Sequence, residues 1–415
     1  MVVPGLLASR LEETPGGNKI WDPDHLAFTV GLMMDSPESL ARRFTPEETP
    51  GQAMKEPRKK RLQTPELIRR GWGGPSWDFY GRGIEDLQKY LLSEGAVVYA
   101  FGYDWRDSNL NSGKLLNHFI EEIRKEKIDG VLRYRFKPIV VTHSNGGLVT
   151  RAACVDGGEA NIAAVLHTFM PTYGTPEAYT KFKLGEKTAL GQILGSNHEE
   201  IACVGGAVKT MGQLLPNQIY PKGRGPWLTW DARLEAEAQP RKPYSLSDPY
   251  SLYLETTGRI GLVNHDTFNQ NAMIIRNGVW VTNTRKRLQY IVNNIKEARK
   301  FHCETVKDYV HPYTYLITGT GIDTSVEARQ HFEQETVYGV QLRSVARTER
   351  LVGPGDQTVS ELTGRAFESH PNCRKSTLLS GIEHAAAFND GLVITGMLLM
   401  IRQARREVPV DLYRW

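Results

Sequence analysis

A serine in a sharp, glycine-rich turn is the side chain best placed to do chemistry. Ser144 lies in IVVTHSNGGL, where the apolar run predicts a strand and the residues from Gly146 onward predict a helix. A serine on such a strained strand-to-helix turn, with small residues two positions away on either side, is typical of a nucleophile. Thr142 departs from the glycine that is usual at the first of these positions, but the turn can tolerate it. We predict that Ser144 is a nucleophile; the alternative is an ordinary serine in a glycine-rich turn.

A nucleophilic serine needs a base, because its hydroxyl is a weak nucleophile at neutral pH. His384, in LLSGIEHAAAF, follows a short apolar run and precedes the last predicted helix, and it is the predicted base. The alternative is a structural histidine of the surface or core. Four further histidines beyond residue 300 fit this position less well, namely His302, His311, His331 and His370.

The base in turn needs a carboxylate that fixes its tautomer, and two aspartates between the serine and the histidine follow predicted strands. Asp356, in the tight turn of RLVGPGDQTV, is the favoured acid, and Asp323, in GTGIDTS, is the runner-up. Either carboxylate could instead cap its own turn. His143 cannot readily aim its ring at the adjacent Ser144, so we expect it to support the turn structurally.

Attack on an ester carbonyl also requires two hydrogen-bond donors for the oxyanion that develops. The backbone N–H of Asn145, directly after the serine, is one predicted donor. The opening MVVPGLL predicts a short strand followed by a turn, which makes the N–H of Leu6 the second. A plain loop is the alternative at Leu6.

Composition restricts the class of protein. The chain has 415 residues, of which 40% are hydrophobic and 24% charged, which excludes a disordered chain, a collagen and a coiled coil. A formal net charge of +4 does not indicate nucleic-acid binding. The four cysteines are scattered without a C-x-x-C pair, so neither a zinc site nor a disulfide framework is expected. The longest apolar run, residues 391–401, is shorter than the ~18 residues that span a bilayer.

The order of the predicted elements indicates an α/β fold with a parallel sheet. Helical periodicity over residues 83–94 and 110–127 alternates with apolar strand-like runs through the first 175 residues. The regularity is lost between residues 177 and 310 and returns with YTYLITGTG and LRSVARTERLVGPGD. We therefore expect a catalytic core of residues 1–176 and 311–415, with residues 177–310 inserted as a cap.

A basic stretch lies within residues 36–76, which we expect to form a lid loop. Residues 55–70 carry seven basic side chains against two acidic ones, and Trp72 and Trp77 follow closely. One interpretation is a solvated surface loop. The other is a patch for anionic phosphate headgroups with the two tryptophans at a lipid interface, which predicts peripheral contact with a membrane or vesicle.

The chain resembles the lecithin:cholesterol acyltransferase family, which includes lysosomal and bacterial phospholipases. The resemblance implies an α/β-hydrolase fold with a mostly parallel sheet, helices on both faces and an inserted cap or lid, acting on an acyl ester of a lipid without metal or organic cofactor. It assigns Ser144, Asp356 and His384 to a catalytic triad and Leu6 and Asn145 to the oxyanion hole. The segments that carry it are, in the family's order, VPGLLASRLEE, YDWR, THSNGG, PTYGTPEA, MGQLLPNQIYP, GPGDQTV and SGIEHAAAF.

The chain departs from the members of that family that act outside the cell. Those members carry a signal peptide and a disulfide-held lid, whereas this sequence opens without a basic n-region and its first cysteine is Cys154. We therefore expect a cytoplasmic enzyme of bacterial type; the alternative is a secreted enzyme whose signal peptide has been removed. The rival function is a carboxylesterase or lactonase for a smaller ester, enclosed by Trp227, Trp230 and cap tyrosines. A non-catalytic lipid-binding protein with a hydrolase fold is a further alternative.

Overall fold

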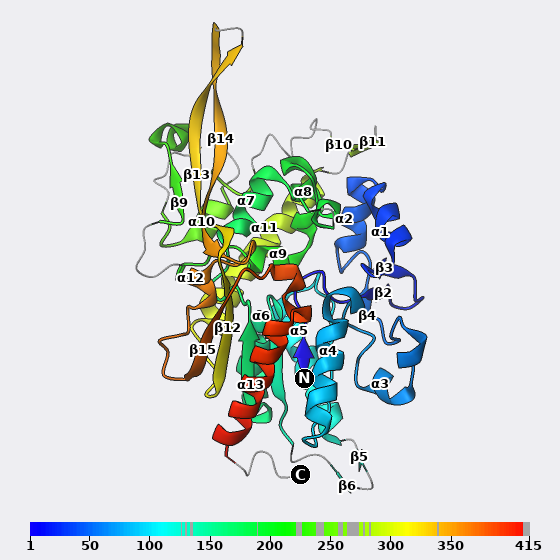
Figure 1. The fold of residues 1–415 in the computed structure, drawn as a ribbon. Coiled ribbons are helices and arrows are strands. Elements are labelled where there is room, and N and C mark those ends of the chain that lie inside the picture. Colours follow the sequence, from blue (N-terminus) through cyan, green and yellow to red (C-terminus); the bar gives the residue numbers. More distant parts are fainter. Residues whose placement is uncertain are drawn as a thin grey trace.

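A five-stranded parallel sheet lies at the centre of the protein, with the strand order β1-β7-β8-β12-β15 (Figure 1). The computed structural model describes residues 1–125, 127–128, 131–132, 136–188, 190–220, 226–237, 245–255, 260–263, 274–276, 279–281, 284–337 and 340–409. The strands of the central sheet are β1 (Val2–Val3), β7 (Ile139–His143), β8 (Ala164–Thr168), β12 (Thr314–Thr320) and β15 (Cys373–Ser380). The predicted α/β class is confirmed.

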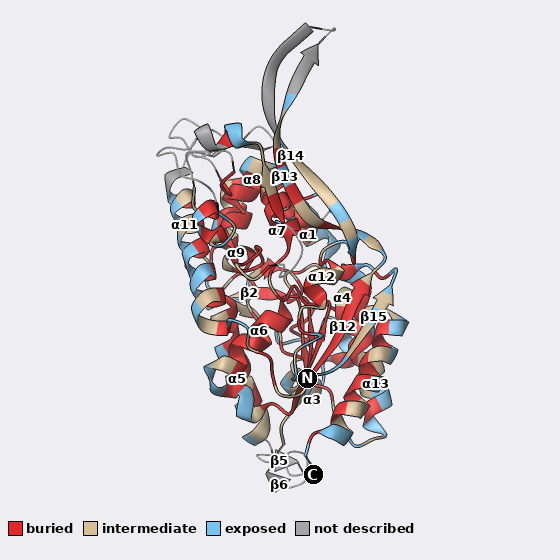
Figure 2. Cartoon of the chain, turned by 90° about the vertical axis from the view of Figure 1, so that its left-hand side faces the viewer, coloured by how far each residue is buried: buried red, intermediate tan, exposed pale blue. Residues whose placement is uncertain are grey.

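Helices cover both faces of this sheet, as the apolar runs of its strands require (Figure 2). Val141 points to one face, where it packs in a core with helices α4 (Trp77–Leu92) and α13 (Gly391–Glu407). Val140 points to the other face, toward α5 (Asn109–Lys125) and α6 (Gly146–Ala153). No helix within the described residues is long and apolar enough to cross a membrane.

The segment after β1 folds into a small antiparallel sheet with three helices. The strand order is β3-β2-β4. Residues 36–76, expected as a lid loop, therefore contain helices and a paired strand, and Leu40 and Phe44 are buried. The elements are β2 (Leu11–Glu13), β3 (Lys19–Trp21), α1 (Leu26–Met33), α2 (Pro37–Phe44), β4 (Gly51–Ala53) and α3 (Pro65–Arg69).

The two tryptophans of this segment are buried, so the expectation that they face a lipid interface is wrong. The exposed fraction is 3% for Trp72 and 6% for Trp77, and the ring centroids lie 6.2 Å apart. The indole N–H of Trp72 donates to the carbonyl of Val98 at 2.9 Å. Burial of the large apolar indole area, with its one polar atom satisfied, stabilises this position more than exposure would.

The residues between β8 and β12 lie above one end of the central sheet (Figure 1). They correspond to the expected cap, and their described elements are short apart from one long helix. These are α7 (Pro176–Leu184), α8 (His198–Cys203), α9 (Lys209–Gln213), β9 (Leu228–Trp230), α10 (Pro249–Tyr253), β10 (Ile274–Arg276), β11 (Val279–Val281) and α11 (Thr284–Lys300).

A long hairpin of β13 (Ile322–Val337) and β14 (Val340–Gly355) projects beyond the body of the protein (Figure 1). The run LRSVARTERLVGPGD, where strand-like regularity was predicted to return, forms most of β14. β13 pairs with β14 and β9 in a separate sheet, and the next central strand is β15. The alternating polar side chains of β14 suit a two-stranded ribbon, whereas strands buried on both faces are apolar throughout.

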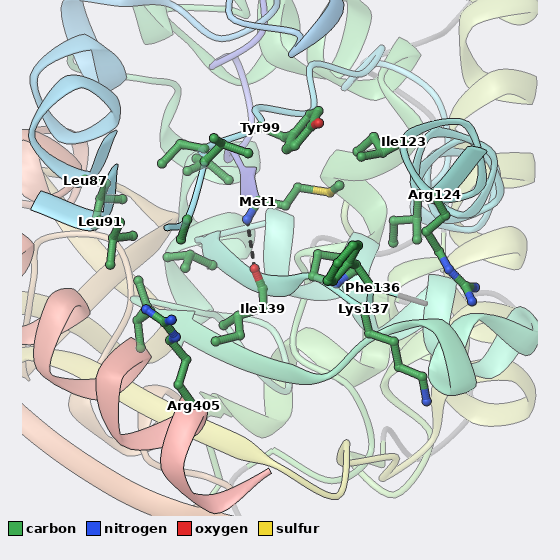
Figure 3. Close-up of a pocket in the computed structure, with 18 residues that line it drawn as sticks. Met1, Leu87, Leu91, Tyr99, Ile123, Arg124, Phe136, Lys137, Ile139 and Arg405 are labelled. Atoms are coloured by element: carbon green, nitrogen blue, oxygen red, sulfur yellow. Dashed lines mark hydrogen bonds between the residues drawn. The ribbon is translucent and has the colours of Figure 1, made fainter. Parts of the chain in front are cut away.

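A small cavity of about 160 Å³ lies at the amino ends of the central strands (Figure 3). Its walls are mainly apolar and include Leu87, Tyr99 and Ile139. The turn that carries Ser144 follows the carboxyl end of β7, at the opposite end of the sheet. This cavity is therefore separate from the predicted site.

Candidate active site

The turn between β7 and α6 holds Ser144 in a left-handed backbone conformation, with φ of +53°. Such a φ is strained for a residue with a side chain and aims that side chain away from the sheet. A Cβ added at Gly146 would lie 2.3 Å from the carbonyl oxygen of Val3, so only glycine allows the turn to lie against β1. Thr142 stands where this kind of turn usually has glycine, and its hydroxyl lies 2.9 Å from Nδ1 of buried His167.

His384 and Asp356 form a buried hydrogen-bonded pair. Nδ1 of His384 lies 2.8 Å from Oδ2 of Asp356, and the main-chain N–H of His384 donates to the Asp356 carbonyl at 2.9 Å. The other carboxylate oxygen accepts the N–H groups of Thr358 at 2.9 Å and Val359 at 2.6 Å. Three donors thus fix the carboxylate, which in turn orients the imidazole through Nδ1.

The other candidates lie elsewhere. Asp323 is exposed on β13, opposite Pro354 of β14, and its main chain accepts a hydrogen bond from Arg350. The other four histidine candidates have different partners. His302 contacts the carbonyl of Gln213, His311 that of Ile162 and His370 the N–H of Asn372, while His331 is in register with Arg347 of β14.

Two backbone N–H groups are available beside the serine. In the part of the chain that the structure describes, the N–H groups of Leu6 and Asn145 donate to no protein acceptor. The Gly5 N–H, in contrast, donates to the hydroxyl of Tyr80 at 2.9 Å. A Cβ added at Gly5 would lie 3.0 Å from Cβ of Ser144, so the loop after β1 packs directly against the serine. The two predicted oxyanion donors therefore flank Ser144.

A buried amide network fixes Asn145, and sequence reasoning missed its partners. The side-chain amide of Asn145 donates to Asn109 at 2.8 Å and accepts from it at 3.1 Å. The same amide donates to the Tyr103 hydroxyl at 3.1 Å, and Gln213 accepts the Asn109 N–H at 2.9 Å. Tyr103 belongs to the segment YDWR and Gln213 to MGQLLPN. Both segments are recognisable in the sequence, but only the structure shows that they hold Asn145 in place.

Ser144 and His384 line one cavity of about 430 Å³. Its walls are mostly apolar and come from the loop after β1, from α4 and from the cap. One ion pair lies on its wall, between Lys181 and Glu186 at 2.6 Å. The apolar side chains that line it are Leu6, Leu7, Ala8, Phe79, Pro171, Ala178, Leu190, Leu194, Met211, Leu214 and Ala385.

Helix α1, which contacts an element that lines this cavity, has an exposed apolar face. Leu26, Val30 and Met34, at helical spacing along α1 and its carboxyl end, have exposed fractions of 76%, 48% and 70%. Helix α1 contacts the turn Gly191–Ile193, and Gly191 lines the cavity. Among the described residues, no three His, Cys, Asp or Glu side chains are close enough together to hold a metal ion.

The central parallel sheet, the helices on both of its faces and the strand–serine–helix turn define an α/β-hydrolase fold. A chain of the solved Tle4–Tli4 complex is similar over almost its whole length: the identity is 19%, 98% of each chain is covered and the TM-score is 0.71. Lipase 1 from Pelosinus fermentans is 13% identical, over 77% of this chain and 91% of that chain, with a TM-score of 0.33. No family model and no curated protein sequence matches the chain.

The turn generates a prediction for Gly146→Ala. The added methyl would lie 2.3 Å from a backbone oxygen, so we expect unfolding to become easier by about 1–3 kcal/mol, measured by denaturant titration. Gly31→Ala, on helix α1, is the matched control, because no atom lies within 4 Å of the position that its added methyl would take. It should leave stability unchanged or raise it by about 0.5–1 kcal/mol. Equal stability changes in both variants would contradict the close packing of the turn.

Proposed function

We propose that the protein is a serine acylhydrolase that cleaves, or transfers, the acyl group of a carboxylic ester of a lipid or phospholipid. One observation carries the proposal: a serine in a left-handed turn shares an apolar cavity with a histidine whose Nδ1 is held by a buried aspartate. The similarity to lecithin:cholesterol acyltransferase enzymes in seven short segments supports the same reaction class.

The proposed reaction uses Ser144, His384 and Asp356 in the roles of nucleophile, base and orienting acid. Ser144 Oγ attacks the ester carbonyl while His384 takes its proton, and the oxyanion accepts the N–H groups of Leu6 and Asn145. The C–O bond to the alcohol then breaks, and His384 returns the proton to the leaving oxygen. Water, or an acceptor alcohol, attacks the acyl-enzyme with His384 again as base. No metal or organic cofactor enters these steps.

The walls of the cavity favour an acyl chain over a compact aromatic group. Leucines and alanines make up most of its apolar lining residues, and burial of a methylene contributes roughly 0.8 kcal/mol. The rival function depended on Trp227, Trp230 and cap tyrosines enclosing the substrate. Neither tryptophan is part of the cavity lining, and Trp227 is buried against Tyr179 and Tyr253.

Hydrolysis of a p-nitrophenyl ester series from acetate to palmitate, beside phospholipid vesicles, tests the proposal. Turnover that increases with chain length, together with release of fatty acid from vesicles, would support a lipid substrate. Turnover limited to the shortest esters would favour the carboxylesterase or lactonase function. A folded protein without turnover on any of these esters would favour the non-catalytic alternative.

Ser144→Ala should lower kcat by about 10⁴-fold or more with the fold intact, because every covalent step passes through that hydroxyl. Steady-state kinetics and circular dichroism on the purified variant provide the measurement. Ser93→Ala, which removes an exposed hydroxyl at the end of α4, is the control and should retain wild-type kcat. More than about a tenth of wild-type activity in Ser144→Ala would assign the nucleophile elsewhere.

The two aspartates give opposite expectations. Asp356→Asn should lower kcat roughly 10³- to 10⁴-fold, because the amide cannot hold the His384 tautomer that takes a proton from serine. Asp323→Asn should leave kcat unchanged, because that carboxylate is exposed on the hairpin. Measurement of both variants on the same ester decides the assignment, and the reverse ranking would transfer the role to Asp323.

Contact with a lipid surface is proposed through the exposed face of α1, which contacts an element that lines the cavity. The basic segment supports it less directly, because three of its cations face acids: Arg61 lies 2.5 Å from Glu85, Arg58 lies 4.0 Å from Asp78, and Arg70 pairs with Glu66. An apolar side chain that enters an interface contributes roughly 1.5–3 kcal/mol, against ~1 kcal/mol for a cation near an anionic surface.

The double variant Leu26→Ser, Val30→Ser should therefore lower activity on phospholipid vesicles while hydrolysis of p-nitrophenyl acetate stays at the wild-type rate. The control is Leu92→Ser with Leu399→Ser, two exposed leucines on α4 and α13. Neutralising the cations of residues 58–61 should lower activity only on anionic vesicles at low salt. Equal vesicle activity in the α1 and control variants would refute the α1 contact.

A further inference from the structure

A continuous chain of buried hydrogen bonds joins the loop after β1 to the main chain of His384. The N–H of Gly5 donates to the hydroxyl of Tyr80 at 2.9 Å. That hydroxyl lies 2.6 Å from Nδ1 of His143. Nε2 of His143 lies 3.1 Å from the carbonyl oxygen of His384. The chain thus crosses from the segment before Leu6, through helix α4 and the end of β7, to the turn that carries His384.

The protons in this chain have one consistent arrangement. The His384 carbonyl can only accept, so Nε2 of His143 must carry a proton. Burial, followed by the nearby His384, lowers the pKa of His143 well below its ordinary value, so this imidazole is neutral and its Nδ1 is an acceptor. The Tyr80 hydroxyl, which receives the Gly5 N–H, must then donate its own proton to Nδ1. Each group along the chain thus donates to the next one, from the Gly5 N–H to the His384 carbonyl.

Aromatic rings pack around the chain, and Tyr80 and His143 also line the cavity that holds Ser144. Tyr80 and His143 are both buried. The Tyr80 ring lies 4.9 Å from that of Phe388, which follows His384 in the short helix His384–Asn389, and the rings of His143 and His384 lie 4.9 Å apart. A buried polar atom left without its partner in such surroundings costs about 1–3 kcal/mol. The geometry of the loop and of the histidine turn therefore depends on this chain.

We propose that Tyr80 and His143 are positioning residues that hold the oxyanion loop and the catalytic histidine at a fixed spacing around Ser144. The inference rests on the proposed hydrolase function and adds two residues to it. Neither ring supplies a group to the reacting atoms: the Tyr80 hydroxyl is taken up by Gly5 and His143, and both nitrogens of His143 are used. Their loss should displace Leu6 and His384 relative to each other.

Tyr80→Phe removes only the hydroxyl and keeps the ring contacts. Since a misplacement of about 1 Å can cost roughly 10²-fold in rate, kcat should fall about tenfold to a hundredfold with KM within about twofold of wild type. The control is Tyr315→Phe, which also removes a buried tyrosine hydroxyl, one that donates to Glu407 at 2.6 Å near the amino end of β12. It should lose thermal stability and retain kcat.

Two isosteres of His143 separate the two halves of the chain. Asn places an amide oxygen near the position of Nδ1, so His143→Asn keeps an acceptor for Tyr80 and loses the contact with His384. Gln places an N–H near the position of Nε2, so His143→Gln keeps the contact with His384 and loses the acceptor. Adding Tyr80→Phe to His143→Gln should therefore lower kcat by less than it does in wild type, because the hydroxyl then holds only the Gly5 N–H. Adding it to His143→Asn, which keeps the acceptor, should lower kcat by more than adding it to His143→Gln.

These outcomes separate failure of the inference from failure of the proposed function. A wild type without ester turnover overturns both. An active wild type overturns the positioning role alone if Tyr80→Phe retains kcat within about twofold, if Tyr315→Phe loses as much kcat, or if Tyr80→Phe costs the same factor in the His143→Gln background as in wild type. The measurement is kcat and KM for wild type and every variant on one soluble ester, with thermal melting to verify folding.

Discussion

The left-handed backbone at Ser144 is the constraint on which the rest of the site depends. A residue with a side chain holds this conformation only where its surroundings fix it, and here β1 and β8 lie close on both sides. The Ser144 N–H donates to the Thr168 carbonyl at 2.9 Å, and Gly146 lies against the carbonyl of Val3. The same approach of β1 brings Leu6 beside the serine. The strain at one residue and the position of the proposed oxyanion donors thus have a common cause.

Buried polar groups, rather than ion pairs at the surface, hold the candidate catalytic residues. Asp356 receives three hydrogen bonds, and the Asn145 amide is fixed by Asn109 and Tyr103. Thr358 and Val359 directly follow Asp356, but His384, Asn109 and Tyr103 come from other parts of the chain, so the site forms only when those parts are assembled. Exposed ion pairs typically contribute less than about 1 kcal/mol, whereas an unsatisfied buried donor costs more. Rigidity at the site is therefore a property of the whole fold.

The sequence allowed the α/β class and the candidate triad to be predicted, because Ser144, Asp356 and His384 each follow a strand in a recognisable turn. The hairpin could not be predicted, since the apolar residues of LRSVARTERLVGPGD are equally compatible with a central strand. Trp72 was misplaced because a basic, proline-broken stretch resembles a solvated loop, although its indole packs inside. The role of Tyr80 could not be predicted from the sequence, because Tyr80 lies within a helix and contacts His143 only in the folded protein.

The proposed reaction requires Ser144 to be an activated nucleophile. Treatment of the folded protein with an alkyl fluorophosphonate, followed by mass spectrometry of the peptides, measures this reactivity. We expect one adduct per chain, on the peptide that contains Ser144, and no adduct when the protein is unfolded beforehand. An unlabelled folded protein, or an adduct on a different residue, would contradict the role of Ser144.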